Sequence, residues 1–173
     1  MITQKKIFTV EECRYILNQI YTQPLKSPHT TSLQESYRFK GANIKYLNVN
    51  IYNPDYSKIL TLLEDRLREF GVVKIPPTID LLEYTVGSSQ KEHRDDYRSV
   101  KRGRSISIML SEEEDYEGGN LIIEDSIASK EIGTLIFFPS DKLHSVSKVT
   151  SGKRLVLVMF LRQENLHIKS GLI

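Results

Sequence analysis

The chain has 173 residues, of which 39% are hydrophobic and 27% are charged, a size and composition typical of one folded domain with a single core. The 24 basic and 22 acidic side chains leave a formal net charge of +2, which argues against a protein dedicated to nucleic-acid binding. The single cysteine, Cys13, excludes an intrachain disulfide and favours a reducing, cytoplasmic setting.

No part of the sequence predicts a membrane segment. Residues 1–6 lack the apolar core of a signal peptide. No stretch approaches the roughly 18 uninterrupted apolar residues that a membrane-spanning helix needs. We therefore expect a cytoplasmic protein without membrane contact.

The amino-terminal segment predicts a short strand at residues 5–8 and then an amphipathic helix. Thr9 can cap this helix because its hydroxyl accepts a hydrogen bond from an unpaired amide of the first turn, and Glu12 stands at capping-box spacing. The helix is expected to end near Thr22. Apolar residues follow helical spacing along one face: Val10, Cys13, Ile16, Leu17 and Ile20.

A loop, a strand and a second helix come next. Residues 23–36 are rich in proline, serine and threonine, which predicts an irregular loop or flap. Residues 42–52 contain alternating apolar positions and predict a strand. Residues 56–70 predict a helix, which Gly71 ends. We expect residues 1–78 to form an αβ segment that supports the remainder of a single domain.

From residue 79 onward the pattern changes to short strands separated by turn residues. Such a pattern favours a sandwich or jelly roll, so the fold class expected is mainly β with flanking α-helices. The last strand is apolar on both faces, as expected if the barrel lies on one side and the amino-terminal helices on the other. The predicted strands cover residues 79–86, 104–110, 120–124, 134–138, 143–149 and 154–161.

Three side chains suggest a metal site. In an extended strand, residues two apart point the same way, so His93 and Asp95 would converge on one point. His144 follows the apolar run at 134–139, where a neighbouring strand is expected. Two imidazoles and one carboxylate on one face of an octahedral ion suit non-haem iron(II). The alternative is a core histidine beside a surface His-x-Asp sequence.

Five short blocks occur in a fixed order around these residues. They are Glu92-His93-Arg94-Asp95, Asp115-Tyr116-Glu117-Gly118-Gly119-Asn120-Leu121, Gly133-Thr134-Leu135-Ile136-Phe137-Phe138-Pro139, Leu143-His144-Ser145-Val146 and Gly152-Lys153-Arg154. In this order the blocks resemble the iron(II)- and 2-oxoglutarate-dependent dioxygenases of the prolyl-4-hydroxylase-like group. The resemblance covers residues 79–162, about half of the chain.

The resemblance implies a double-stranded β-helix, the jelly roll of the cupins, as the catalytic core at residues 79–162. It also implies that His93, Asp95 and His144 hold Fe²⁺, that 2-oxoglutarate and dioxygen are consumed, and that ascorbate serves as a reductant. The reaction implied is oxidative decarboxylation of 2-oxoglutarate coupled to hydroxylation of an unactivated C–H bond.

Arg154 is the expected partner of the far carboxylate of 2-oxoglutarate. It shares a strand face with Val156 and Val158, where an unpaired permanent charge would be costly. A guanidinium fork binds a carboxylate through two hydrogen bonds. The alternative places Arg154 at the exposed start of the strand.

Three further residues are candidates for the cosubstrate site. Tyr84 resembles the tyrosine that lines this site in many relatives, although a core tyrosine is the alternative. Several prolyl hydroxylases carry a tyrosine where this chain has Gln90 and Met109. Strand alternation makes Met109 face the cavity together with Ser105 and Ser107, so a serine hydroxyl such as that of Ser107 could replace the missing phenol.

The primary substrate is not named by these residues. Arg98, Lys101 and Arg102 belong to a basic loop that either attracts an anionic substrate or is only a solvated surface. We expect a prolyl or other residue of a protein or peptide to be hydroxylated. One alternative is a hydroxylase of amino acids or metabolites, and another is a metal- or sugar-binding jelly roll without turnover.

Overall fold

The computed structural model describes residues 1–22, 39–40, 44–96 and 103–167. The predicted flap at 23–36 and most of the basic loop, including Arg98, Lys101 and Arg102, lie outside the described residues. Among the described residues, no helix has both the length and the apolar character that crossing a membrane requires.

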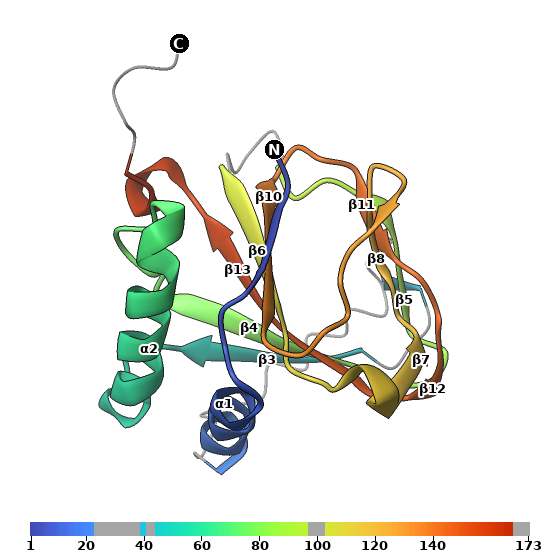
Figure 1. Cartoon of the computed structure of the whole chain (residues 1–173), viewed down its shortest axis with the longest axis horizontal. Helices are drawn as coiled ribbons and strands as arrows, with labels where there is room; N and C mark the ends of the chain where they lie inside the picture. The colour runs from blue at the N-terminus through green and yellow to red at the C-terminus, as the bar shows by residue number, and fades with distance from the viewer. Residues whose placement is uncertain (23–38, 41–43, 97–102, 168–173) are drawn as a thin grey trace.

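Two antiparallel sheets face each other in the described part of the chain (Figure 1). The first has the order β1-β10-β6-β13-β4-β3 and the second the order β2-β5-β11-β8-β9. This arrangement confirms the predicted mainly β jelly roll. The first sheet comprises β1 (Thr3–Lys6), β3 (Ile44–Asn50), β4 (Thr78–Tyr84), β6 (Arg104–Met109), β10 (Thr134–Pro139) and β13 (Arg154–Leu161). The second comprises β2 (Phe39–Lys40), β5 (Ser89–His93), β8 (Leu121–Ile123), β9 (Ser126–Ile127) and β11 (His144–Val146). A separate pair is made of β7 (Tyr116–Gly118) and β12 (Val149–Gly152).

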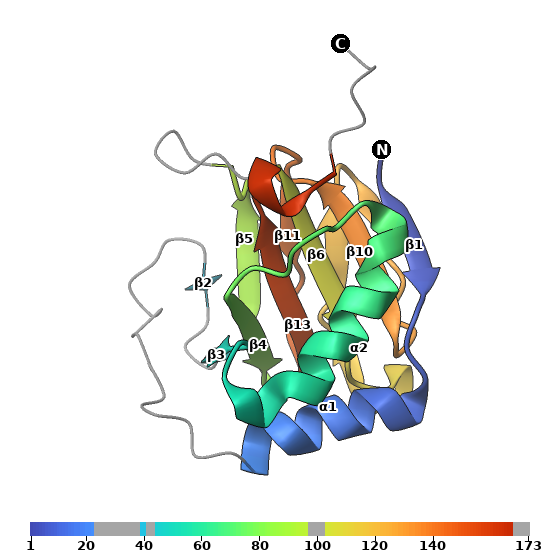
Figure 2. The same ribbon diagram turned by 90° about the vertical axis from the view of Figure 1, so that its left-hand side faces the viewer.

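Two helices, α1 (Val10–Thr22) and α2 (Ser57–Leu67), cover the outer face of the first sheet (Figures 1 and 2). The predicted capping box of α1 is confirmed, since Glu12 N donates to Thr9 Oγ1 at 3.1 Å and Thr9 N donates to Glu12 Oε2 at 2.9 Å. Gly71, with φ of 76°, ends the second helical segment, as predicted. The 3₁₀ turns are η2 (Pro54–Tyr56), η3 (Arg68–Phe70), η4 (Glu113–Asp115) and η5 (Gln163–Asn165).

The first sheet separates two apolar clusters, and β13 contributes to both. Leu157 and Met159 pack in the cluster that includes the helices, whereas Val156 packs in the cluster between the two sheets. This arrangement confirms the prediction that β13 is covered on both faces. Its strand alternation sends successive side chains into different clusters.

Some predicted boundaries were wrong. The strand β5 was missing from the predicted set because its sequence, Ser-Gln-Lys-Glu-His, carries no apolar alternation. The single strand predicted at 143–149 is two shorter strands, β11 and β12, which pair with different partners. The first strand is Thr3–Lys6, slightly earlier than predicted. The division of the chain at residue 78 stays a prediction.

Candidate functional site

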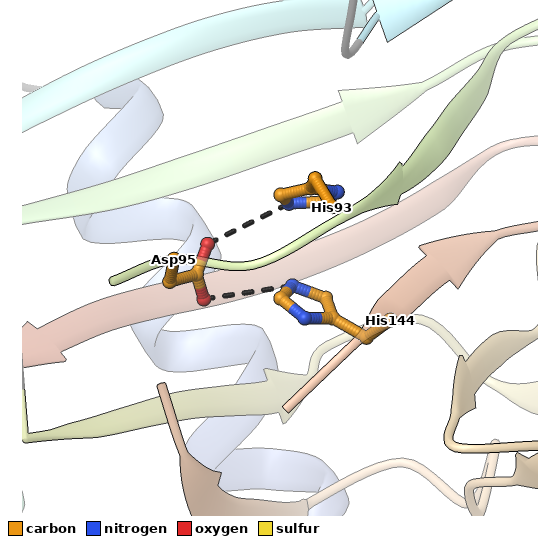
Figure 3. A group of neighbouring side chains, drawn as sticks. All are labelled: His93, Asp95 and His144. Atoms are coloured by element: carbon orange, nitrogen blue, oxygen red, sulfur yellow. Dashed lines mark ion pairs between the residues drawn. The ribbon is translucent and has the colours of Figure 1, made fainter. Parts of the chain in front are cut away.

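His93, Asp95 and His144 come together in the second sheet, near its face toward the first. His93 ends β5, His144 begins β11, and the two are register partners in the antiparallel pair. Asp95 lies opposite the two rings and directs one carboxylate oxygen toward each (Figure 3). One potential ligand atom from each of the three buried residues lies within 4.8 Å of the others.

The reason given from the sequence for this convergence was wrong in one respect. The strand β5 ends at His93, so Asp95 does not belong to the same extended strand. Asp95 lies in a bend, and the backbone amides of Asp95 and Asp96 both donate to the carbonyl of Ser140, at 2.9 and 3.0 Å. The backbone bonds, rather than strand alternation, position the carboxylate.

The two imidazoles are oriented for metal binding. His93 Nδ1 lies 2.7 Å from the carbonyl oxygen of Lys91, and His144 Nδ1 lies 2.9 Å from that of Lys142. A carbonyl can only accept, so each Nδ1 carries a proton, and in the neutral ring Nε2 is the nitrogen that can bind a cation. These two Nε2 atoms lie 3.5 Å from the two carboxylate oxygens of Asp95. The donor set fits a divalent cation, and the bonds to the carbonyls of Lys91 and Lys142 orient both rings.

The environment of Asp95 favours its ionised form. Burial alone raises the pKa of this carboxyl, and it is the largest single influence. It is outweighed by the hydrogen bond with His93, the charge that His144 carries when protonated and the hydrogen bond from Ser105, so the net pKa is lowered. The hydroxyl of Ser105 donates to Asp95 Oδ2 at 2.6 Å and also contacts Ser140 Oγ at 2.9 Å. Sequence analysis placed Ser105 on the cavity side but did not identify it as a partner of the aspartate.

Arg154 is buried, with only 2% of its surface exposed. This burial excludes the alternative of an exposed residue at the start of the strand. Its Nη2 lies 3.9 Å from the sulfur of Met109, while its Nε and Nη1 have no hydrogen-bond partner among the described residues. A buried guanidinium with two unpaired nitrogens indicates a site for an anion.

Two buried tyrosines adjoin Arg154. The guanidinium carbon lies 4.8 Å from the centre of the Tyr84 ring, a cation–π distance. Burial raises the pKa of Tyr84 and of Tyr116, and Arg154 opposes that rise in both. Both phenols therefore stay protonated and can donate. Tyr116 lies in one of the five ordered blocks, but the sequence did not identify it as a neighbour of Arg154.

The side-chain alternation predicted for β6 is confirmed. Ile106 and Ile108 pack in the cluster on the helix side, whereas Met109 packs between the sheets. No contact between Ser107 and Arg154 was found among the described residues, so its role as a cosubstrate ligand stays a prediction. Thr134, which sequence analysis missed, has a buried hydroxyl without a described partner. It shares the inner face of β10 with Ile136 and Phe138, which pack between the sheets.

A chain of contacts joins Arg154 to the histidines. Beyond the Arg154–Tyr84 contact, the hydroxyl of Tyr84 donates to Gln90 Oε1 at 3.2 Å, and Gln90 Nε2 lies 3.2 Å from His93 Nε2. The anion-binding candidate and the metal-binding candidate are therefore the two ends of one site between the sheets.

Comparison with known proteins agrees with this arrangement. Residues 79–162 match the family described as the 2OG-Fe(II) oxygenase superfamily. A PKHD-type hydroxylase of Saccharophagus degradans is 39% identical over 67 residues, which are 36% of this chain and 30% of that protein. Another, from Parvibaculum lavamentivorans, is 39% identical over 89 residues, which are 47% of this chain and 40% of that protein. The matched segments thus cover less than half the length of these relatives.

Solved structures share this fold over most of the chain. A viral collagen prolyl hydroxylase from Paramecium bursaria Chlorella virus-1 superposes with a TM-score of 0.67 at 17% identity, covering 92% of this chain and 93% of that one. A prolyl-4-hydroxylase from Pseudomonas putida gives a TM-score of 0.65 at 16% identity, covering 94% and 92%. At this identity the likeness shows the fold. Residues 79–162, slightly under half of the chain, are therefore similar in sequence to the 2OG-Fe(II) oxygenase superfamily, and the described fold is similar to that of the two prolyl hydroxylases.

Proposed function

We propose that this protein is an iron(II)- and 2-oxoglutarate-dependent dioxygenase that hydroxylates an unactivated C–H bond. His93, Asp95 and His144 hold the iron, and Arg154 holds the far carboxylate of 2-oxoglutarate. Two imidazole nitrogens and one carboxylate leave positions open for a chelating 2-oxo acid and dioxygen. When bound, iron(II) and 2-oxoglutarate supply the oxidising chemistry, in which dioxygen is reduced and the 2-oxo acid is converted to succinate and carbon dioxide.

The observation that carries this proposal is the burial of Arg154 without a carboxylate partner. A metal site alone has no need of a guanidinium inside the protein, and an unpaired buried charge destabilises the fold. Here two unpaired nitrogens of one guanidinium stand at the opposite end of the contact chain from the metal ligands. A dicarboxylate that chelates the metal at one end and pairs with the guanidinium at the other accounts for both the metal ligands and the buried Arg154.

The neighbouring residues orient these groups. Ser105 and the amides of Asp95 and Asp96 fix the carboxylate ligand, and the carbonyls of Lys91 and Lys142 fix the two rings. The apolar cluster between the sheets keeps water away from the charged ends. Tyr84 positions the guanidinium by stacking beneath it.

A residue of a protein or peptide is the proposed primary substrate. The viral neighbour is named a collagen prolyl hydroxylase, and a prolyl hydroxylase from Trichoplax adhaerens, with a TM-score of 0.65 at 13% identity, was solved with a hypoxia inducible factor peptide fragment. An amino-acid or metabolite hydroxylase is the second candidate for substrate. Mass spectrometry of peptides and metabolites incubated with the enzyme, iron(II), ascorbate and 2-oxoglutarate distinguishes them by which gains one oxygen atom.

The decisive test compares wild type with Arg154→Ala and Arg154→Lys. Anaerobic titration of the iron(II) protein with 2-oxoglutarate is followed by the absorption that a chelated 2-oxo acid produces. We expect Arg154→Ala to keep iron binding and to lose about 30-fold or more in 2-oxoglutarate affinity. Arg154→Lys should recover only part of it, because an ammonium lacks the planar fork. Equal 2-oxoglutarate affinity in wild type and Arg154→Ala would refute the cosubstrate assignment.

The cytoplasmic location and the use of ascorbate stay predictions.

A further inference from the structure

A β-bulge beside the metal ligands changes the direction of one side chain. In the β5–β11 pair, His144 is the partner of His93, and Val146 is the partner of Gln90. Two residue steps on β11 thus correspond to three steps on β5, and the extra residue lies at Lys91–Glu92. In a regular strand, residues three apart point to opposite faces. The bulge puts Gln90 on the same face as His93.

The contacts of Gln90 agree with this direction. Its Nε2 lies 3.2 Å from His93 Nε2, whereas Lys91 and Glu92 are both exposed. The hydroxyl of Tyr84 donates to Gln90 Oε1, which fixes the orientation of the carboxamide with its amine toward the histidine. Because His93 donates through Nδ1 to Lys91, its Nε2 accepts the hydrogen bond from Gln90.

This hydrogen bond and a metal bond exclude each other. His93 Nε2 has one lone pair, which either accepts the N–H of Gln90 or binds a cation. When a cation takes the lone pair, the carboxamide remains beside the ion's other ligands, still held by Tyr84, and its N–H needs a new acceptor. A carboxylate oxygen of a metal-chelating acid is such an acceptor.

We propose that Gln90 is a metal-coupled positioning residue: it caps His93 Nε2 while the metal is absent, and once the metal binds it donates that N–H to the carboxylate at the chelating end of the 2-oxo acid. This inference rests on the proposed function, because it requires a 2-oxo acid on the metal. Gln90 lies on the route from Tyr84 to His93, so its donor is beside the chelating end, as Arg154 is beside the far end.

The proposal predicts two changes of opposite sign in Gln90→Leu, which has a similar size but no hydrogen-bonding groups. Mn²⁺ no longer has to displace the amide from His93, so the variant should bind Mn²⁺ about two- to tenfold more tightly. The Mn²⁺ protein should then bind 2-oxoglutarate about 10- to 100-fold more weakly, since a hydrogen bond to a charged group is lost. Calorimetric titration measures both, and a merely structural role would weaken both or change neither.

The matched control is Gln163→Leu, which makes the same chemical change at an exposed position in η5. It should leave both affinities unchanged. A Gln90→Leu protein with unchanged or weaker Mn²⁺ binding, or with unchanged 2-oxoglutarate binding, overturns the inference. If the wild-type Mn²⁺ protein itself fails to bind 2-oxoglutarate, the proposed function has failed, and the two failures are thereby distinguished.

A measurement on the wild-type protein avoids any dependence on the folding of the variant. The side-chain amide of Gln90 in ¹⁵N-labelled protein is assigned by its disappearance in the Gln90→Leu spectrum or, if that variant does not fold, by through-bond assignment. It should shift when Zn²⁺ is added and shift again when 2-oxoglutarate follows. The inference is overturned if the Gln90 resonance does not shift when Zn²⁺ is added. It is also overturned if the resonance shifts with Zn²⁺ but not with the 2-oxoglutarate added afterwards.

Discussion

The hydroxyl of Ser105 donates to Asp95 Oδ2, the oxygen that also lies 3.5 Å from His144 Nε2. Ser105 begins the inner face of β6, whereas Asp95 lies in the bend after β5. A residue of the first sheet thus orients a metal-ligand candidate carried by the second. The position of the carboxylate depends on how the two sheets face each other.

Ser105→Ala should weaken metal binding about 10- to 100-fold, because the carboxylate loses the donor that fixes its direction. Calorimetric titration with Mn²⁺ measures the change. Ser126→Ala, at an exposed position of β9, is the matched control and should bind as wild type does. Wild-type affinity in Ser105→Ala would show that the backbone bonds to Ser140 suffice.

Alanine substitutions of His93, Asp95 and His144 should each abolish stoichiometric iron(II) binding, since each removes one of three ligand atoms. The proteins should remain folded because the apolar clusters on both sides of the first sheet are untouched. Iron(II) titration under anaerobic conditions, with circular dichroism for folding, measures both. His167→Ala, an exposed residue after η5, is the control. A variant that keeps wild-type affinity would remove that residue from the site.

Arg154→Met should raise the free energy of unfolding in the absence of 2-oxoglutarate, by about 1–3 kcal/mol. The substitution replaces a buried group that has two unsatisfied donors with an apolar side chain of similar length. Chemical denaturation measures the change. With metal present, added 2-oxoglutarate should stabilise wild type much more than the variant. A less stable variant would mean that the guanidinium has partners that stabilise the fold.

Cys13 should make stability depend on pH. Burial raises the pKa of its thiol to about 12, with a smaller contribution from Glu12. Above the ordinary thiol pKa of about 8.5, the unfolded chain loses a proton that the folded protein retains. The contribution of the Cys13 thiol to stability is therefore complete below the pKa of the unfolded chain. It is lost as the pH rises from there through the pKa of the folded protein. The difference in unfolding free energy between wild type and Cys13→Ala should narrow between about pH 8.5 and pH 10. A constant difference would contradict the raised pKa.

The sequence by itself determined the elements whose signal is local. The capping box of Thr9 and Glu12, the end of the second helix at Gly71 and the two-faced apolar pattern of β13 depend on neighbours along the chain. The ordered blocks around His93, Asp95 and His144 indicated the metal site through their resemblance to a known family. The burial of Arg154 followed from strand alternation.

Only the tertiary structure decided how the site is assembled. The strand β5 has no apolar pattern, and its bulge exists only relative to β11, so no local signal could point Gln90 toward His93. Likewise, Ser105 is brought to Asp95, and Tyr116 to Arg154, by packing between elements distant in sequence. Periodicity records which face of a strand is buried. It does not record which residue of another strand lies opposite, because register and sheet-to-sheet packing are set by the whole core.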